Sequence, residues 1–297
     1  MMNIALAGDR NVLSGIELVI YSTMLHNKNI HWYILTMDIA VPDRDGQMRQ
    51  FYGITDEPTQ TWLKWLVHFM DYNSDITFVD CAELYQQHLE HSVNRHTGFT
   101  PYASLRLLAD LFMPFENDPQ KMKPDDDFLL YLDADVIVQK NLESMYWGTL
   151  QWDQDYAAYT LPEACGGFGE LISAVILFNL RRIRHTGLLN NARRNYNSKM
   201  YPFPDQGALY DAGLPVPLNE TYNYMRDHKK CTYKPHIIHF SNENYTKIYN
   251  QSIPEGRFWE YYPEHQYLKI GLDAAKEIFE NYHPGIPVRR RFSNMVM

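Results

Sequence analysis

Residues 128–138 read Phe-Leu-Leu-Tyr-Leu-Asp-Ala-Asp-Val-Ile-Val, and this stretch decides both the fold class and the kind of site. An apolar run ends in Asp133 and Asp135, and more strand-forming residues follow. An ionised carboxylate is costly to bury alone, so such a close pair needs a counter-charge. Mg²⁺ or Mn²⁺ supplies that charge and prefers oxygen ligands. Because ligands of open α/β sheets bind beyond the carboxyl ends of the strands, the pair predicts a metal site able to hold a diphosphate.

The two aspartates also have a simpler interpretation, in which they only end a strand. Asp is a common turn residue, and a bare Asp-x-Asp carries little information about function. Here the apolar flanks on both sides of Asp133 and Asp135 favour the metal site over the turn.

Strand and helix patterns alternate along the rest of the chain. Apolar strand patterns cover 3–7, 31–36, 76–79, 171–180 and 237–240, and helical spacing covers 14–25, 59–70, 103–113 and 181–196. This alternation predicts an α/β fold with a Rossmann-like, mostly parallel sheet and helices on both faces. Trp62 and Trp65 are expected to pack in the core or on a helix face.

Composition and charge exclude several classes of protein. The chain has 297 residues, 45% of them hydrophobic, so it can bury a sizeable core. A net charge of −9 argues against nucleic acid as the main partner, although a nucleotide neutralised by a metal is compatible with it.

The cysteines and the apolar runs bear on the cellular compartment. The chain has three cysteines, Cys81, Cys165 and Cys231, and no two of them form a Cys-x-x-Cys motif. We therefore expect free thiols in a reducing compartment. The first ten residues lack the features of a signal peptide, and no apolar run is long enough to span a bilayer. We therefore expect a cytoplasmic protein.

Four motifs together resemble one enzyme family. The first is residues 6–11 (Leu-Ala-Gly-Asp-Arg-Asn), and the second is residues 100–110 (Thr-Pro-Tyr-Ala-Ser-Leu-Arg-Leu-Leu-Ala-Asp). The third combines residues 133–135 with a segment near the end of the chain, residues 237–240 (Ile-Ile-His-Phe). The fourth is residues 204–209 (Pro-Asp-Gln-Gly-Ala-Leu). From Asn3 to about Lys247 the chain resembles glycosyltransferase family 8, which includes bacterial lipopolysaccharide galactosyl- and glucosyltransferases and, more distantly, glycogenin. The resemblance implies a GT-A fold over residues 1–250. It also implies transfer of galactose or glucose from a UDP-sugar to a glycan acceptor, with retention and with Mn²⁺ or Mg²⁺, in cell-surface polysaccharide or lipopolysaccharide biosynthesis.

The resemblance assigns the nucleotide of the donor to the first two motifs. Asp9 and Asn11 match the positions that contact uracil and ribose; a carboxylate can accept the uracil N3–H, and an amide offers both donor and acceptor. Arg106 matches an arginine that reaches the sugar nucleotide, which suits its rigid fork of donors. Ala7 and Ala134 lie in the same motifs and complete the nucleotide-binding set. The simpler alternatives are a helix-capping turn for Asp9 and an exposed helix residue for Arg106.

The resemblance also implies a third metal ligand, His239, beside Asp133 and Asp135. A neutral imidazole is a good Mn²⁺ ligand, and a distant segment that returns to the sheet can complete such a site. The alternatives are a histidine merely packed on its strand, and His236 as the ligand instead.

Asp205 and Gln206 match the motif that meets the donor hexose. Asp205 is expected to accept hydrogen bonds from sugar hydroxyls, and Gln206 to lie near the anomeric carbon. An amide oxygen is a poor nucleophile but can stabilise developing positive charge. We therefore favour same-face attack, with the metal and hydrogen-bond donors stabilising the UDP leaving group. The alternative is a turn rich in Pro and Gly.

Two departures from the family pattern leave questions open. Ile172-Ser173-Ala174 stands where the family often has Asn-x-Gly, so the choice between galactose and glucose is undecided. The late motif lacks its Gly, and Lys247 is either the cation beside the diphosphate or a solvated lysine. These departures motivate an alternative function, a catalytically idle UDP-sugar-binding protein. A nucleotidyltransferase is disfavoured because residues 8–11 are too short and acidic for its Gly-rich basic loop.

Residues 251–297 form a C-terminal extension with a basic cluster, Arg289, Arg290 and Arg291. Such a cluster is commonly a solvated end. It could instead contact anionic lipid head groups, since a lipid-linked saccharide acceptor would place the enzyme at the inner face of the membrane.

Overall fold

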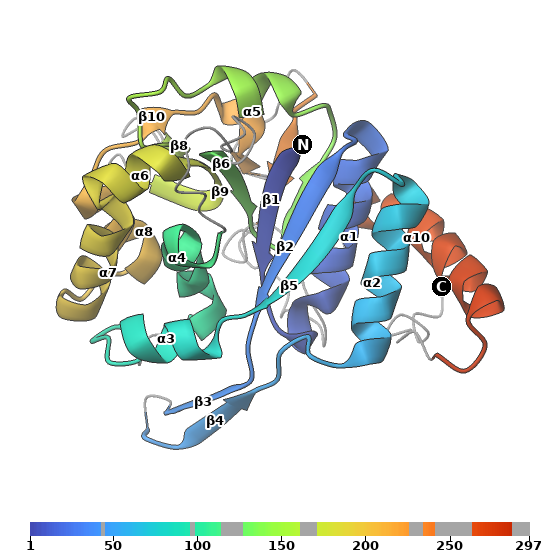
Figure 1. The fold of residues 1–297 in the computed structure, drawn as a ribbon, viewed down its shortest axis with the longest axis horizontal. Helices are drawn as coiled ribbons and strands as arrows, with labels where there is room; N and C mark the ends of the chain where they lie inside the picture. The colour runs from blue at the N-terminus through green and yellow to red at the C-terminus, as the bar shows by residue number, and fades with distance from the viewer. Residues whose placement is uncertain are drawn as a thin grey trace, which may run out of the picture.

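The computed structural model describes residues 1–42, 45–95, 99–113, 127–160, 171–225, 234–240 and 263–286, with side chains from 265 onward in the last range. Within these ranges the centre is a seven-stranded sheet in the order β10-β8-β9-β6-β1-β2-β5 (Figure 1). Its strands are β1 (Met2–Ala7), β2 (Ile30–Thr36), β5 (Asp75–Asp80), β6 (Phe128–Leu132), β8 (Tyr156–Thr160), β9 (Leu171–Asn179) and β10 (Val216–Pro217).

The sheet is mostly parallel. β1 pairs in parallel with β2 and β6, β2 with β5, and β10 with β8, whereas β9 runs antiparallel to both β6 and β8. β1 and β9 are buried at every position, as expected for strands covered on both faces. Because Leu6 pairs with Leu132, the turns after β1 and β6 emerge at the same edge of the sheet.

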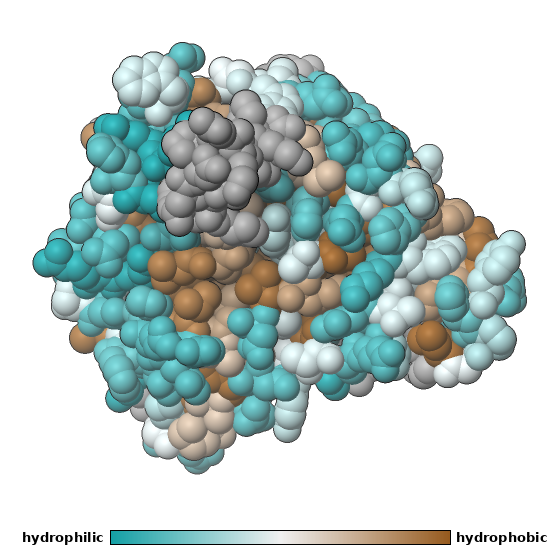
Figure 2. Space-filling view, in the orientation of Figure 1, coloured by the Kyte–Doolittle hydropathy of each residue, from teal (hydrophilic) through white to brown (hydrophobic). Residues whose placement is uncertain are grey.

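Helices cover both faces of the sheet and bury one hydrophobic cluster on each (Figure 1). One face carries α1 (Leu13–His26), α2 (Glu57–Met70) and α10 (Pro263–Tyr282). The other carries α3 (Ala82–His88), the 3₁₀ helix η2 (Pro101–Leu108), α4 (Ala109–Phe112), α6 (Leu180–Thr186), α7 (Leu188–Ser198) and α8 (Pro204–Ala212). The outer face of α7 is hydrophilic (Figure 2). The predicted α/β architecture is confirmed.

Smaller elements complete the described chain. β7 (Val136–Val138) and β11 (Tyr224–Met225) flank β12 (Ile237–His239), and β3 (Ile39–Pro42) and β4 (Met48–Phe51) form a hairpin. The remaining pieces are α5 (Glu143–Gly148) and the 3₁₀ turns η1 (Arg10–Val12) and η5 (Glu220–Tyr222). None of the helices in the described ranges combines the length and apolar character that crossing a bilayer requires.

The segment around Asp205, for which a turn was the alternative, is a helix, α8, since Pro204 occupies its first turn, where a missing N–H costs nothing. Two predicted helices need correction. The stretch 103–113 is mostly a 3₁₀ helix, η2, and only its end is α-helical, in α4. The helical stretch 181–196 is broken at Gly187, whose φ of 71° lies in the left-handed region that ends helices.

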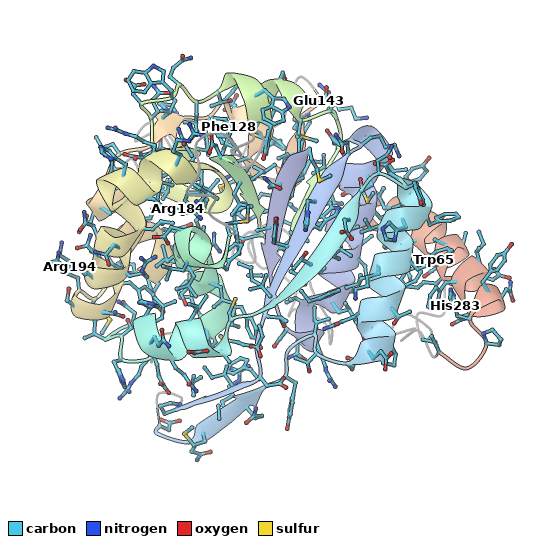
Figure 3. All side chains as sticks on the ribbon, viewed as in Figure 1. Trp65, Phe128, Glu143, Arg184, Arg194 and His283 are labelled. Carbon is cyan, nitrogen blue, oxygen red and sulfur yellow. The ribbon has the colours of Figure 1, made fainter. Side chains whose placement is uncertain are left out.

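A buried ion pair fixes α10 to α1. Lys276 Nζ lies 2.7 Å from Glu17 Oε2, with the two side chains only 2% and 4% exposed. Trp62 Nε1–H of α2 donates to the other Glu17 oxygen at 2.7 Å, which confirms Trp62 as a core residue. Trp65 extends from α2 toward α10, where its ring lies 5.4 Å from that of Phe279 (Figure 3). The last described helix therefore shares the main core with the first.

Removing one partner of this ion pair is expected to destabilise the protein strongly. Lys276→Met leaves Glu17 as an uncompensated buried charge, which should cost about 3–5 kcal/mol of unfolding free energy in urea titrations. The control is Lys199→Met, because the Lys199–Asp211 pair is similarly short, at 3.0 Å, but its side chains are 53% and 41% exposed. Exposed pairs contribute less than about 1 kcal/mol. Equal costs for the two variants would contradict this account of α10.

His265 at the start of α10 packs on Phe240, with ring centroids 4.5 Å apart. Burial lowers the pKa of His265 from 6.5 to about 3. The unfolded chain therefore binds an extra proton between these values. The stability from neutral His265 is complete above about pH 6.5 and is lost as the pH falls toward 3.

We accordingly expect the free energy of unfolding to fall at acidic pH because of His265. Between pH 7 and pH 5 this residue should lower the unfolding free energy by about 2 kcal/mol. His265→Gln should remove that part of the pH dependence in thermal unfolding, whereas His185→Gln, at an exposed position, should not. An unchanged slope in His265→Gln would rule out the assignment.

Candidate functional site

The site lies where the turns after β1 and β6 meet. Asp9 accepts hydrogen bonds from the Asn11 backbone N–H and from Asn11 Nδ2, both at 2.9 Å, and caps η1. The capping interpretation of Asp9 is thus confirmed, and its contact with a nucleotide base stays a prediction. A Cβ at Gly15 would collide with the carbonyl oxygen of Ala134, so glycine allows α1 to pack directly against the Asp133–Asp135 turn.

Arg106 joins this turn to α8. It is 3% exposed, and its Nη2 donates to Asp133 Oδ1 at 2.7 Å, while Nε lies 3.2 Å from Asp205 Oδ2. Its Nη1 donates to the Ser173 carbonyl oxygen, and the guanidinium lies 4.4 Å above the Tyr131 ring. The alternative of an exposed helix arginine is therefore wrong.

The charges around Arg106 are strongly coupled. Burial alone would lower the Arg106 pKa, but the carboxylates of Asp133 and Asp205 outweigh burial and raise it. Burial raises the pKa of Asp205, opposed by the Arg106 charge. The guanidinium is thus a permanent positive charge that holds the Asp133 and Asp205 carboxylates in place.

Asp135 and His239 face each other across β7 and β12. Antiparallel pairing places His239 opposite Val136, and His239 Nε2 lies 3.7 Å from Asp135 Oδ1. Burial, and then the neighbouring Asp133 charge, raises the pKa of Asp135 well above its usual range. His236, the rival ligand, instead packs on the Tyr222 ring, 4.4 Å away.

The donors at this point fit a hard divalent cation. They are two carboxylates and an imidazole, and Asp135 Oδ1 is buried without a hydrogen-bond partner in the described part of the chain. Nevertheless, no three histidine, cysteine or acidic side chains in the described ranges are arranged as a metal-binding site. One reason is that Asp133 is directed at Arg106. The three-ligand set of Asp133, Asp135 and His239 stays a prediction.

Asp205 and Gln206 occupy the first turn of α8, beside β9. Gln206 Oε1 accepts from the Ser173 backbone N–H at 3.0 Å and lies 3.1 Å from Ser173 Oγ. Asp205 Oδ2 also lies 3.1 Å from that hydroxyl. The fold thus brings Asp133, Arg106, Asp205 and Gln206 together, as the motifs predict.

Two residues near the site were not predicted from the sequence. Ser173 contacts Arg106, Asp205 and Gln206, and Asn223 is fully buried and donates to the Ile172 carbonyl oxygen at 3.2 Å. The sequence does mark Ser173 as unusual, since it is a polar residue inside an otherwise apolar run. No sequence pattern marks Asn223 as a residue of the site.

Several predicted residues lie outside the described residues. They are Lys247, Cys165, Cys231 and the cluster Arg289, Arg290 and Arg291. Cys81 is described, and it is a buried free thiol as expected.

Searches by sequence give no relatives: no family model matches the chain, and no curated protein gives a significant match. By structure, the chain is similar to the glycosyltransferase GlyE of Streptococcus pneumoniae TIGR4 (TM-score 0.59, 17% identity, 95% of this chain and 65% of that chain). It is also similar to the galactosyltransferase LgtC in complex with donor and acceptor sugar analogs (0.54, 14%, 94% and 96%). A third similar structure is mouse xyloside xylosyltransferase 1 (0.56, 12%, 82% and 98%).

These similarities establish the fold class. The chain has the GT-A fold of glycosyltransferases, as predicted, with a mostly parallel α/β sheet at its centre. It spans 65% of the GlyE chain and 51% of the bifunctional glycosyltransferase WbbM, another similar structure.

Replacing Asp135 should have opposite effects without and with a divalent cation. Asp135→Asn removes a partly buried charge, 26% exposed, beside Asp133, so metal-free protein should gain about 1 kcal/mol of unfolding free energy. Mn²⁺ at a hundred times its dissociation constant should stabilise the unsubstituted protein by about 2.7 kcal/mol and this variant hardly at all. Thermal unfolding with Mn²⁺ and with chelator measures both effects.

Asp75→Asn is the matched control, since Asp75 is 60% exposed on β5 and should respond to Mn²⁺ like the unsubstituted protein. Equal Mn²⁺ stabilisation of Asp135→Asn and Asp75→Asn would remove Asp135 from the metal site.

Proposed function

We propose that the protein is a metal-dependent, retaining hexosyltransferase similar to glycosyltransferase family 8. It transfers galactose or glucose from a UDP-sugar to a glycan or lipid-linked saccharide in cell-surface polysaccharide or lipopolysaccharide biosynthesis. The observation that carries the proposal is the position of Arg106, within 2.7 Å of Asp133 and 3.2 Å of Asp205. This arginine joins the two motifs that the resemblance assigns to diphosphate and hexose in one buried cluster.

The nucleotide would lie along the turns after β1 and β6. In this proposal Asp9 and Asn11 contact the uridine, and Ala7 and Ala134 line the same edge of the sheet. Lys247 would neutralise the diphosphate. The shared edge of β1 and β6 supports this placement, because ligands of such sheets bind at the carboxyl ends of the strands.

Asp133, Asp135 and His239 would hold Mn²⁺ or Mg²⁺. When bound, the cation neutralises negative charge on the leaving diphosphate. The buried Asp135 Oδ1, which has no hydrogen-bond partner among the described residues, and the imidazole 3.7 Å away support this set.

The transfer itself would occur on one face of the hexose. The bond from the anomeric carbon to the UDP oxygen breaks, and its electron pair leaves with UDP. The acceptor hydroxyl forms the new bond on the same face, and its proton passes to the departing diphosphate. Asp205 holds a sugar hydroxyl, and Arg106 keeps the Asp205 and Asp133 carboxylates in place throughout.

A catalytically idle UDP-sugar-binding protein is the second candidate. Ile172 favours it, because its side chain offers no hydrogen bond where the family often has Asn. A cytoplasmic location and lipid contact through Arg289, Arg290 and Arg291 are part of the main proposal and rest on the sequence alone.

Calorimetric titration with UDP-galactose and UDP-glucose tests the proposal directly. We expect both UDP-sugars to bind with Mn²⁺ and neither to bind after chelation. In a separate assay without an acceptor, we expect slow but measurable hydrolysis of the UDP-hexose. Arg106→Lys should lower kcat/KM of this hydrolysis by about a hundredfold, since an ammonium cannot replace the fork of donors.

Arg193→Lys controls for the loss of a buried arginine. Arg193 is nearly as buried and contacts Asp110 and the Leu107 carbonyl oxygen of η2 in place of Asp133 and Asp205, so its variant should keep most of the kcat/KM of the unsubstituted enzyme. Absence of UDP-hexose binding by folded protein would refute the proposal. Binding of a UDP-hexose with neither hydrolysis nor transfer to any saccharide would favour the catalytically idle UDP-sugar-binding protein.

A further inference from the structure

β9 is irregular next to the site. Ala158 and Tyr159 are consecutive in β8, yet they pair with Ile176 and Ile172, so Ser173, Ala174 and Val175 have no partner on β8. At such bulges, which are common beside active sites, backbone groups lose their inter-strand hydrogen bonds and can point toward other partners. On its other side β9 stays attached to the site, because the Asp133 N–H donates to the Ala174 carbonyl oxygen at 2.9 Å.

Ser173 directs its freed groups at three site residues. Its backbone N–H donates to Gln206 Oε1 at 3.0 Å, and its carbonyl oxygen accepts from Arg106 Nη1. Its hydroxyl lies 3.1 Å from both Gln206 Oε1 and Asp205 Oδ2. The hydroxyl has one proton and can serve one of these two acceptors at a time, whereas the backbone N–H is always available to Gln206.

This backbone bond determines which end of the Gln206 carboxamide faces outward. A peptide N–H can only donate, and the carboxamide has a single acceptor atom, Oε1. The opposite orientation would place the Gln206 NH₂ against the Ser173 N–H, two donors with no acceptor between them. The oxygen is therefore held on β9, and the NH₂ group is the end left for a ligand.

We propose that Ser173 is a positioning residue that makes Gln206 a hydrogen-bond donor toward the sugar nucleotide. The inference rests on the proposed function, which places the donor hexose at Asp205 and Gln206. It replaces the role expected from the sequence, in which the amide oxygen stabilises positive charge at the anomeric carbon. With Oε1 occupied by Ser173, Gln206 donates from Nε2 to an oxygen atom of the bound UDP-hexose.

Hydrogen exchange tests the orientation without any catalysis. In ligand-free protein, Gln206→Ala removes the acceptor and should speed exchange of the Ser173 N–H about tenfold. Gln206→Glu keeps an acceptor oxygen and should leave that exchange slow. The Val138 N–H, which donates to Ser22 Oγ at 3.2 Å, is the internal control and should be unaffected by either variant. Unchanged exchange at Ser173 in Gln206→Ala would overturn the inference.

Hydrolysis of UDP-galactose or UDP-glucose tests the consequence. Ser173→Ala keeps the backbone N–H on Gln206 Oε1 and removes only the hydroxyl contacts with Asp205 and Gln206. It should therefore lower kcat by no more than about fivefold with little change in the donor KM, and Ser173→Thr, which keeps the hydroxyl, should restore kcat. Gln206→Glu should lose activity at neutral pH and regain it as the pH falls, because a protonated carboxyl is again a donor.

Ser22→Ala controls for the loss of a buried serine hydroxyl, since Ser22 is fully buried in α1 and should leave kcat unchanged. Because Ser173→Ala keeps the backbone N–H that orients Gln206, the decisive variant is Gln206→Glu. Full activity of Gln206→Glu at neutral pH, or no recovery as the pH falls, would overturn the donor role of Gln206. Should the unsubstituted protein neither bind nor hydrolyse these donors, the proposed function fails, while the exchange measurement still decides how Gln206 is oriented.

Discussion

The buried charge of Arg106 is the constraint on which the site depends. A guanidinium removed from water is costly unless its donors are matched, and here two carboxylates and two carbonyl oxygens match them. The dependence is mutual, because Asp205 is nearly as buried and needs that positive charge. The end of β6, the bulge of β9 and the first turn of α8 must therefore be in place together, which makes the site a property of the assembled sheet.

Much of this arrangement could be predicted from the sequence, for identifiable reasons. Mostly apolar runs indicated β1, β6 and β9, because strands covered on both faces tolerate few polar residues. The grouping of Asp133, Arg106, Asp205 and Gln206 followed from the family pattern and not from spacing alone.

Other features could not be predicted because they depend on distant pairing. The contacts of Ser173 arise from the shifted register between β8 and β9, which no local pattern encodes. The direction of the Asp133 carboxylate, toward Arg106, likewise depends on how η2 packs on the sheet. The Glu17–Lys276 pair joins residues 259 positions apart, and each alone resembles an ordinary surface charge.

That separation has a consequence for synthesis on the ribosome. Lys276 leaves the exit tunnel only after the ribosome has added 259 more residues beyond Glu17. Translation adds about 5–20 residues per second, so many seconds pass between the synthesis of α1 and that of α10. During this time the Glu17 carboxylate lacks the lysine that it needs in order to be buried. Completion of the core around α1 must therefore wait for the synthesis of α10, and a nascent chain stalled before α10 presents an incomplete core to chaperones and proteases.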